Sequence, residues 1–281
     1  MIDQPYKSVV FEWLSESGEV IDNSADRRFG ESGWIDYPMP PELGKGGYEV
    51  LELALGTTLV HSTLEFTRAA LGKMVPLMKV DVSFNEPSFQ AMALRGLRGS
   101  VKETYPPALL ACSPGIDLFR HTTHYCSDFS VDASFSGELC HVSLERTTLN
   151  KLIGDQLTDL ILCKLDIQRS PGITVATIPM HISQHLFAAV MRQQTGAARK
   201  LFCQAKILEY LASLVHFACA SDEVSAEHNQ KSRQRAQAIH AQLTGSEGKR
   251  SFTLVSKSKP EPPGMRMSLT KICGPSASLT E

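Results

Sequence analysis

The sequence predicts an α+β protein in which an antiparallel β-barrel is followed by a helical hairpin and a largely disordered C-terminal region. Between residues 45 and 146, short segments of strand character are separated by Gly, Pro or Asn at intervals of roughly ten residues. From Leu149 onward, the apolar residues recur at helical spacing instead. After Gly248, three prolines interrupt any helix. These changes of period define the predicted organisation of the chain.

Residues 1–44 are polar, and Gly and Pro punctuate their second half, so we expect a lead-in segment with little regular structure. The barrel then covers residues 45–146. Its strands are predicted at 48–55, 57–67, 78–84, 89–97, 108–112, 116–122, 125–131 and 139–144. A small barrel fills its interior with side chains or encloses one small molecule, so this fold permits ligand binding without proving it. No charge cluster within the predicted strands indicates the chemical class of a ligand.

A helical region is predicted over residues 147–226. Its first helix has Thr147 or Thr148 available as N-cap and ends before Pro171-Gly172. The apolar residues that set its period are Leu149, Leu152, Ile153, Leu157, Leu160 and Ile161.

The next two segments are predicted to form a helical hairpin with its break at Gly196. A shorter helix is marked by Ile182, Leu186, Ala189, Val190 and Gln193. In the longer helix, 197–220, two apolar stripes lie side by side: Leu201, Ala205, Leu208, Ala212, Val215 and Cys219, and then Ile207, Leu211, Leu214 and Ala218. Such a wide face suits packing on the protomer and on a second copy. We therefore expect a homodimer whose interface includes Leu201, Leu208, Leu211 and Val215.

The amino-acid sequence of several segments resembles the sensor half of AraC/XylS-type bacterial transcription regulators, particularly the branch that includes siderophore-responsive members. The matching residues are Gly47–Leu53 with Gly56, Cys140–Leu144 running into Leu149, Leu152, Ile153 and Gly154, Ile178-Pro179-Met180, Thr195-Gly196, 199–202 and 205–212. The resemblance covers roughly residues 45–245. It implies a cupin-like sensor barrel that binds a small effector of unknown class, a helical dimerisation region, and transcription regulation without a cofactor.

The C-terminal region, 227–281, departs from that family. Residues 232–243 form a plausible helix, but the paired helices of a helix-turn-helix unit do not follow it. A truncated or frame-shifted DNA-binding region would explain the change in character. Basic residues in this tail permit weak, non-specific contacts to DNA phosphates, and we assign these to Lys249, Arg250, Lys257 and Lys259.

Composition agrees with a soluble regulator. The formal net charge is −2, so no basic field over the whole chain indicates nucleic acid or a membrane as partner. Seven cysteines without paired short spacings favour reduced thiols over a disulfide framework. The sequence lacks a signal peptide and a long apolar run, so we expect a cytoplasmic protein with no membrane partner.

Metal-binding and catalytic motifs are weak. His121, His124, Cys126, Cys140 and His141 offer ligand atoms of the kind that zinc or iron takes, but on a regular strand His121 and His124 would point to opposite faces. The spacing also differs from that of metal-binding cupins. His181 and His185 lie four residues apart without an HExxH context, which favours a surface or interface pair. No nucleophile elbow or phosphate-binding loop occurs, so we predict neither catalytic residues nor a metal site.

Two functions therefore remain open. The first is an effector-sensing regulator of AraC/XylS type with an incomplete DNA-binding region. The second is a stand-alone cupin-like enzyme or small-molecule binding protein with a helical appendage, in which metal-dependent activity is the runner-up. Bound metal would favour the enzyme, whereas metal-free dimers stabilised by a small molecule would favour the regulator.

Overall fold

The computed structural model describes residues 6–15, 19–23, 33–190 and 195–245 of the chain. These residues belong to two compact units, Met1–Glu227 and His228–Glu281, of which the second contributes only the end of one helix to the described part.

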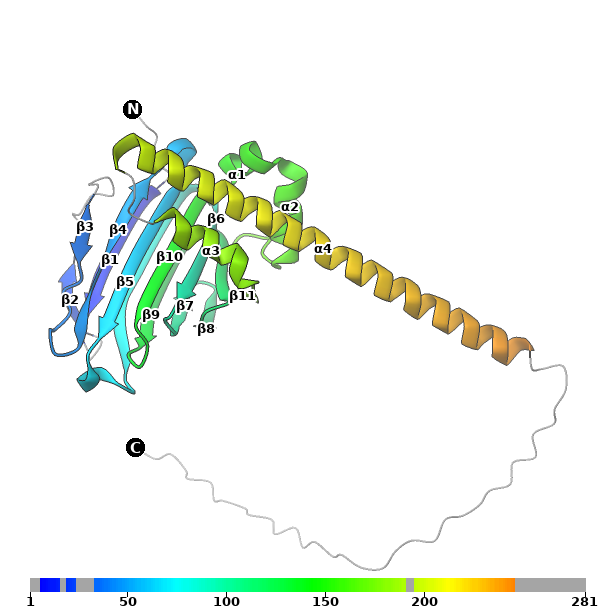
Figure 1. Cartoon of the computed structure of the whole chain (residues 1–281), viewed down its shortest axis with the longest axis horizontal. Coiled ribbons are helices and arrows are strands. Elements are labelled where there is room, and N and C mark those ends of the chain that lie inside the picture. The colour runs from blue at the N-terminus through cyan, green and yellow to red at the C-terminus, as the bar shows by residue number, and fades with distance from the viewer. Residues whose placement is uncertain (1–5, 16–18, 24–32, 191–194, 246–281) are drawn as a thin grey trace, which may run out of the picture. The chain divides into compact units, whose positions relative to one another are not determined.

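One mostly antiparallel sheet organises this unit (Figure 1). Its described strands follow the order β3-β4-β5-β10-β6-β9-β7-β8, with β1 and β2 attached through β6 and with β11 attached to β9. Their bounds are β1 Tyr6–Leu14, β2 Val20–Asn23, β3 Trp34–Asp36, β4 Gly44–Glu52, β5 Thr58–Phe66, β6 Met74–Arg95, β7 Gly99–Thr104, β8 Pro107–Cys112, β9 Ile116–Asp132, β10 Gly137–Glu145 and β11 Gly172–Thr177.

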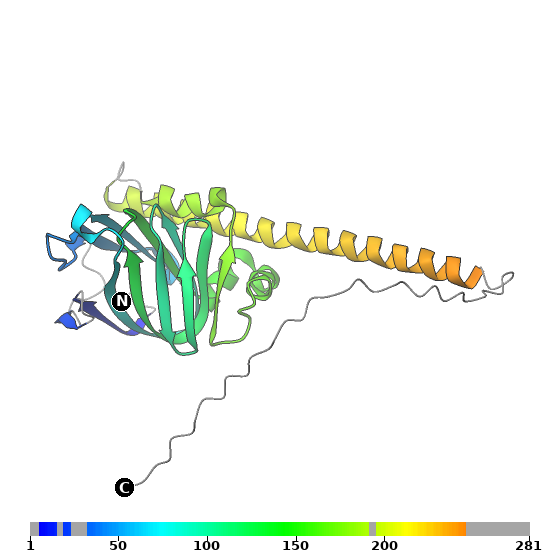
Figure 2. The same ribbon diagram turned by 90° about the horizontal axis from the view of Figure 1, so that it is seen from below.

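Two long strands, β6 and β9, bend the sheet upon itself (Figure 2). The first half of β6 pairs with β1 and the second half with β10, while β9 pairs with both halves. Their ladder is interrupted between Ser83 and Ser88, which is where an irregular pairing allows a sharp bend. The separate strands predicted at 78–84 and 89–97, and at 116–122 and 125–131, are therefore continuous strands that bend.

The predicted closed barrel is corrected by the strand order. The sheet path ends at β3 and at β8, and none of the described pairings joins these two edges. The bend in β6 and β9 offers a physical reason, because it turns the two halves of the sheet to face each other, and they pack through side chains while the edges at β3 and β8 do not pair with each other. Interior and exterior faces still alternate along each strand, as in a barrel.

The lead-in segment contains regular structure, contrary to the expectation from its Gly and Pro residues. Strand β1 pairs with β6 from Tyr6↔Phe84 to Trp13↔Met78, and β3 pairs with β4. The side chain of Trp13 is buried in the core. Most of the Gly and Pro residues of this segment, which disfavour regular structure, lie at residues 30–41. The β-branched and aromatic residues of β1 precede them and form a strand.

Four α-helices complete the described part: α1 Arg146–Ile153, α2 Asp155–Lys164, α3 Met180–Ala189 and α4 Gly196–Gly245. Gly154, with φ of +85°, splits the predicted first helix into α1 and α2. The predicted N-cap is also wrong, since Glu145 holds that position and the hydroxyl of Thr148 donates to the carbonyl of Leu55. The helix predicted at 232–243 is part of α4.

Helices α3 and α4 lie across the outer face of β4, β5 and β10 (Figure 1). The core beneath them joins Leu59, Phe89 and Val142 of the sheet to one buried stripe of α4. That stripe consists of Cys203, Ile207, Tyr210, Leu211, Leu214 and Ala218. A second core lies between the two halves of the sheet. None of the helices among the described residues is long and apolar enough to cross a bilayer.

Candidate functional site

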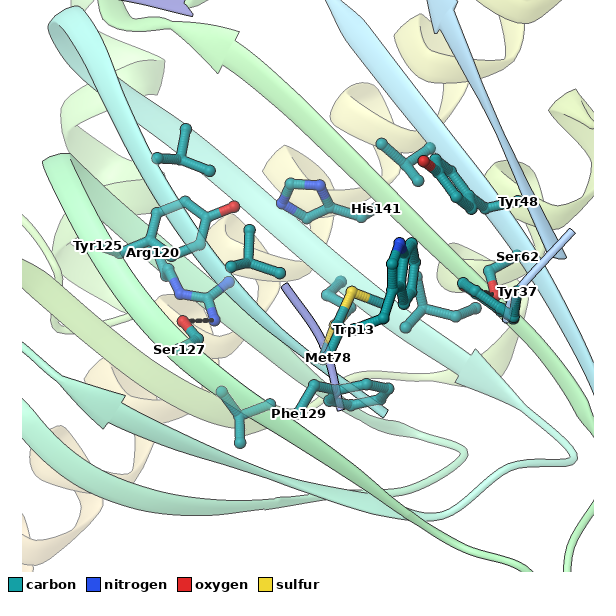
Figure 3. A pocket seen from close by; sticks show the side chains of 16 residues that line it. Trp13, Tyr37, Tyr48, Ser62, Met78, Arg120, Tyr125, Ser127, Phe129 and His141 are labelled. Carbon is teal, nitrogen blue, oxygen red and sulfur yellow. Dashed lines mark hydrogen bonds between the residues drawn. The ribbon is translucent and has the colours of Figure 1, made fainter. Parts of the chain in front are cut away.

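The inner face of the bent sheet encloses a cavity of about 100 Å³ (Figure 3). Its lining comes from both halves of the sheet: Trp13, Tyr37, Tyr48, Val60, Ser62, Met78, Val80, Val82, Met92, Val101, Arg120, Tyr125, Ser127, Phe129, Leu139 and His141. A cavity on the order of 150 Å³ accommodates a benzene ring. The space is smaller than this and therefore limits a ligand to at most one small ring.

Strand alternation explains why these side chains share one face. Along β10, Leu139 and His141 line the cavity, while Cys140 between them is buried against the helices. Along β9, Arg120 lines the cavity, and after the interruption Tyr125, Ser127 and Phe129 do so. The lining residue before the interruption has an even number and those after it have odd numbers. The irregular pairing therefore shifts the alternation of faces by one residue.

An aromatic cluster forms the apolar end of the cavity. The ring of Trp13 lies edge-on to Tyr37 at 4.8 Å between centroids, and Tyr37 stacks on Tyr48 at 5.6 Å. The hydroxyls of Tyr37 and Ser62 share a hydrogen bond of 2.6 Å. Burial raises the pKa of Tyr37 above its ordinary value, so this hydroxyl stays neutral. The cluster offers ring faces and carries no charge.

The opposite end of the cavity holds a buried ion pair. Nε of Arg120 donates to Oε1 of Glu103 at 2.9 Å, and Nη2 donates to the same oxygen and to Oγ of Ser127. The hydroxyl of Ser127 in turn donates to Oε1 of Glu103 at 2.7 Å, and the guanidinium lies 4.5 Å from the ring centroid of Tyr125. Glu103 comes from β7, a strand that the sequence pattern did not predict, so this pair lies partly outside the predicted strands.

His141 adds a second polar group to the lining. Burial, reinforced by the positive charge of Arg120, lowers its pKa to about 3, so the imidazole is neutral near pH 7. Its Nε2 has no hydrogen-bond partner among the described residues. A buried polar atom of this kind is uncommon and indicates a position that water or a ligand satisfies.

The residues that the sequence offered as candidate metal ligands, without predicting a metal site, do not converge. His121 is buried, with Nδ1 3.1 Å from the carbonyl oxygen of Ile167, whereas Nε2 of His124 lies 3.0 Å from Oδ1 of Asp81. The thiol of Cys140 donates to the carbonyl of Leu186, and burial raises its pKa well above the ordinary value. Cys126 is half-buried and free. Within the described ranges, no three His, Cys, Asp or Glu residues form a metal-binding group.

The pair on α3 separates in the same way. His181 is exposed, while Nδ1 of His185 lies 3.1 Å from Oε2 of Glu209 on α4. The cavity itself presents one imidazole and a guanidinium that is already paired. This donor set does not fit a divalent metal, which takes several neutral imidazoles, thiolates or carboxylates.

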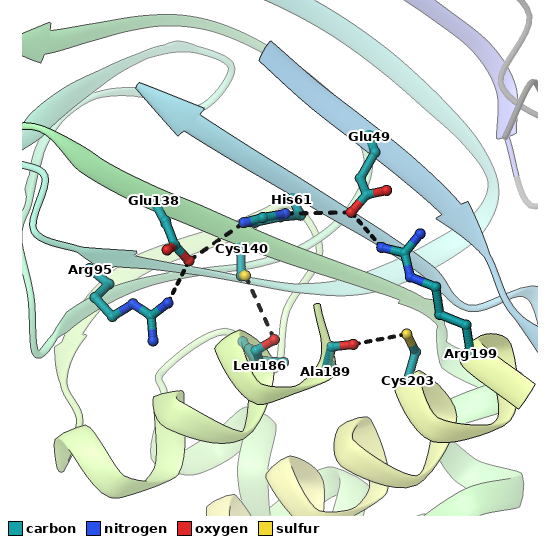
Figure 4. A network of polar contacts seen from close by, with 9 residues as sticks. All are labelled: Glu49, His61, Arg95, Glu138, Cys140, Leu186, Ala189, Arg199 and Cys203. Carbon is teal, nitrogen blue, oxygen red and sulfur yellow. Dashed lines mark hydrogen bonds and ion pairs between the residues drawn. The ribbon is translucent and has the colours of Figure 1, made fainter. Parts of the chain in front are cut away.

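A polar network lies on the other face of the cavity wall (Figure 4). Nη2 of Arg199, near the start of α4, donates to Oε1 of Glu49 at 2.6 Å. His61 lies between two carboxylates, 3.5 Å from Glu49 and 3.5 Å from Glu138, and Glu138 also accepts from Arg95 at 2.6 Å. Each of Glu49 and His61 is adjacent in sequence to a cavity residue, Tyr48 and Ser62 respectively.

The predicted dimer residues have different environments. Leu201 and Leu208 are exposed, at 73% and 39%, and Val215 is partly buried. Leu211 is fully buried within the protomer, facing the sheet, so in this structure it is not accessible to a partner. The predicted phosphate-binding residues lie outside the described residues, namely Lys249, Arg250, Lys257 and Lys259.

Sequence reasoning missed most of the cavity. Trp13 lay in the segment that was predicted to have little structure, and Arg120 and Ser127 were not singled out. A signal for Arg120 was present, since this charged residue directly follows Leu118 and Phe119 within the predicted strand 116–122. Its partner could not be identified from local pattern.

Comparisons with known proteins give low similarities. No protein family matches the sequence, and no curated protein does. Among solved structures, the AraC-like transcriptional activator CuxR is 9% identical, with 60% of this chain and 56% of that chain covered and a TM-score of 0.28. ToxT from Vibrio cholerae is 8% identical, with 62% and 58% covered and a TM-score of 0.30. A cupin-2 domain from Rhodospirillum rubrum is 15% identical, with 48% and 90% covered and a TM-score of 0.25.

The chain thus spans less than two thirds of the length of either regulator. An enzyme, ectoine synthase from P. lautus, is similar at 9% identity and a TM-score of 0.22, with 53% of this chain and 82% of that chain covered. TM-scores this low do not establish a shared fold. Neither the family nor the activity of the chain follows from these likenesses.

Proposed function

We propose that the chain is an effector-sensing protein of the AraC/XylS-like regulator type, in which a small molecule binds in the central cavity and alters how α4 associates with a second copy. The cavity is the observation that carries this proposal. It holds an apolar end of aromatic side chains together with a few convergent polar groups, which is the composition of small-molecule sites.

The cavity wall offers a short route from the ligand to α4. On β4, Tyr48 faces the cavity and Glu49 faces α4, where it accepts a hydrogen bond from Arg199. On β5, Ser62 faces the cavity and its neighbour His61 lies 3.5 Å from Glu49. A shift of β4 on ligand binding therefore moves the partner of Arg199 directly, and a shift of β5 acts on Glu49 through His61. A ligand contacts one face of β4 and β5, and α4 packs against the other face. Both can therefore shift the same equilibrium between two packing arrangements of these strands.

Helix α4 provides the output surface in this proposal. Its buried stripe packs on the sheet, and the neighbouring stripe with Leu201, Ala205, Leu208 and Ala212 is exposed in the protomer. Exposed apolar residues in a row on a helix suit an isologous contact with the same helix of a second copy. In a regulator, the basic residues after Gly248 would add weak contacts to DNA phosphates.

A thermal-shift screen of neutral, anionic and cationic small molecules tests the sensing function. The matched control is Val60→Phe, which places a ring into the cavity from β5. A binder present at about 100 times its Kd adds about 2.7 kcal/mol to the free energy of unfolding. We expect compounds that raise the Tm of the wild-type protein and leave the Tm of the variant unchanged.

Two outcomes would contradict the proposal. If no compound separates the wild-type protein from Val60→Phe, the cavity is packing space and not a binding site. If the purified protein carries stoichiometric metal by elemental analysis and converts a compound, the cupin-like enzyme is the better description.

A further inference from the structure

We infer that the cavity selects a neutral, single-ring molecule with one hydroxyl group, of which a simple phenol is the representative. This inference rests on the proposed sensing function and specifies the chemical class of its ligand. It follows from the size of the cavity, its charge balance and the hydrogen-bonding groups that its lining leaves free.

Size and shape limit the ligand first. The cavity volume of about 100 Å³ is smaller than the roughly 150 Å³ of a cavity that holds benzene, so it limits the ligand to a single small ring. Trp13, Tyr37 and Tyr48 present aromatic surface along one end, and Met78 and Phe129 extend the apolar lining. An aromatic ring placed here gains edge-to-face and stacking contacts with flat neighbours.

Charge balance excludes ionised ligands. The one positive charge in the lining, Arg120, is paired with Glu103, and both side chains are almost fully buried, at 5% and 1% exposure. His141 is neutral because its pKa is lowered to about 3. A carboxylate or an ammonium group that entered this space would lose its hydration and find no unpaired opposite charge among the described lining residues.

The free hydrogen-bonding groups define the substituent. The hydrogen bonds of Arg120 use Nε and Nη2, so Nη1 still has two N–H groups without a partner in the described part of the chain. A guanidinium can only donate, so the ligand atom opposite it must accept. The neutral ring of His141 has one N–H and one lone pair, and its Nε2 has no partner there either. A hydroxyl both donates and accepts, and therefore suits Arg120 and His141 equally well.

Isothermal titration calorimetry on the full chain tests the inference with three probes of similar size. Phenol is neutral and carries the hydroxyl, toluene lacks it, and benzoate carries a charge. Because a hydrogen bond to a charged or buried partner changes affinity by about tenfold or more, we expect phenol to bind at least tenfold more tightly than toluene and benzoate.

Three variants locate the preference. His141→Phe keeps a ring in place and removes both ring nitrogens, and it should bring the affinity for phenol close to that for toluene. The double variant R120M/E103L replaces the ion pair by apolar side chains of similar length, so that no buried charge is left alone, and it should have the same effect. His124→Phe, outside the cavity, is the control and should leave all three affinities unchanged.

The remaining results would overturn the inference in distinguishable ways. Benzoate binding as tightly as phenol would refute the neutral class and leave small-molecule sensing intact. An affinity for phenol that stays at the wild-type value in both polar variants would refute the assigned contacts. If none of the three probes binds, while the broader screen finds compounds that bind the wild-type protein and not Val60→Phe, the inferred ligand class is wrong and the sensing function stands. If neither the probes nor the screened compounds bind, the ligand class and the sensing function are both wrong.

Discussion

Individual buried residues in this protein differ from their sequence neighbours mainly through the face of the strand that they occupy. Cys140 and His141 illustrate this, because one is a thiol packed against α3 and the other is a cavity imidazole without a partner for Nε2. The sequence placed both in one group of candidate metal ligands. Strand alternation separates them, so that only His141 lines the cavity.

A buried carboxyl group gives a prediction on pH and stability. Asp117 of β9 is 1% exposed, accepts a hydrogen bond from the hydroxyl of Ser183 on α3, and has a pKa raised to about 6, mainly by burial. Because the folded pKa lies above the unfolded one, the protonated form is favoured in the folded protein. Its contribution to stability is present below about pH 4 and is lost as the pH rises through 6.

Asp117→Asn should remove this pH dependence. At pH 7.5 we expect the variant to have a free energy of unfolding about 2 to 3 kcal/mol higher than the wild-type protein, whereas at pH 4 the two should be nearly equal. Urea unfolding at both pH values measures the difference. An equal difference at both would show that the carboxyl group does not titrate in this range.

At the scale of elements, α4 carries two apolar stripes that the sequence could not rank. The stripe with Ile207, Leu211 and Leu214 is the buried one, and the stripe with Leu201 and Leu208 is exposed. Both stripes have helical spacing. The buried stripe also contains Cys203 and Tyr210, whose side chains help to fill the space over the sheet. Leu208 and Leu211 therefore form a matched pair for experiment.

Leu208→Glu should weaken dimerisation by at least about tenfold and change the free energy of unfolding of the protomer by less than about 0.5 kcal/mol, because the side chain is exposed within the protomer. Leu211→Glu should instead destabilise the fold by at least about 3 kcal/mol, since it buries an unpaired charge. Analytical ultracentrifugation and urea unfolding separate these effects. Unchanged association in Leu208→Glu would argue against the exposed stripe as an interface.

The contact between Arg199 and Glu49 gives a second prediction at this scale. We expect the pair variant R199M/E49Q to bind a cavity ligand with the affinity of the wild-type protein, since neither residue lines the cavity. In this variant the ligand should change the dimer dissociation constant by less than about twofold, because the contact between β4 and α4 is removed.

Sedimentation with and without ligand measures this coupling. A matched pair variant is R146M/D159N, which removes an ion pair between α1 and α2. It should keep the full ligand effect on dimerisation. If both pair variants respond alike to the ligand, coupling does not pass through Arg199.

At the scale of the whole molecule, we expect DNA binding that is weak and without sequence preference. The basic residues after Gly248 lie among Pro260, Pro262 and Pro263, so the sequence supplies phosphate contacts and no rigid helix for reading bases. Specific regulators exceed their own non-specific affinity by at least about a thousandfold. A titration of promoter and scrambled fragments at near-physiological salt measures this ratio. Discrimination of about a hundredfold or more would mean that these residues form a competent DNA-reading domain.

Much of the local structure could be predicted from the sequence. Alternation and turn residues located the strands from β4 onward, apart from β7 and β11, and the 3.6-residue period located α3 and α4. Breaks were harder to predict, because Gly154 ends a helix through its backbone conformation and the interruption in β6 and β9 leaves the strand pattern almost unchanged. The candidate site was not predicted, since its residues come from β1, β4, β5, β6, β7, β9 and β10 and from Tyr37, which follows β3.

The sequence by itself determined most of the strands from β4 onward and the helical segments, because those depend on neighbours two to four residues apart. The tertiary structure alone decided that the sheet stays open, that Arg120 meets Glu103 across β7 and β9, and which stripe of α4 is buried. These outcomes depend on the register of strands that are distant in the chain and on the volume that remains between them. Local periodicity carries no information about either quantity.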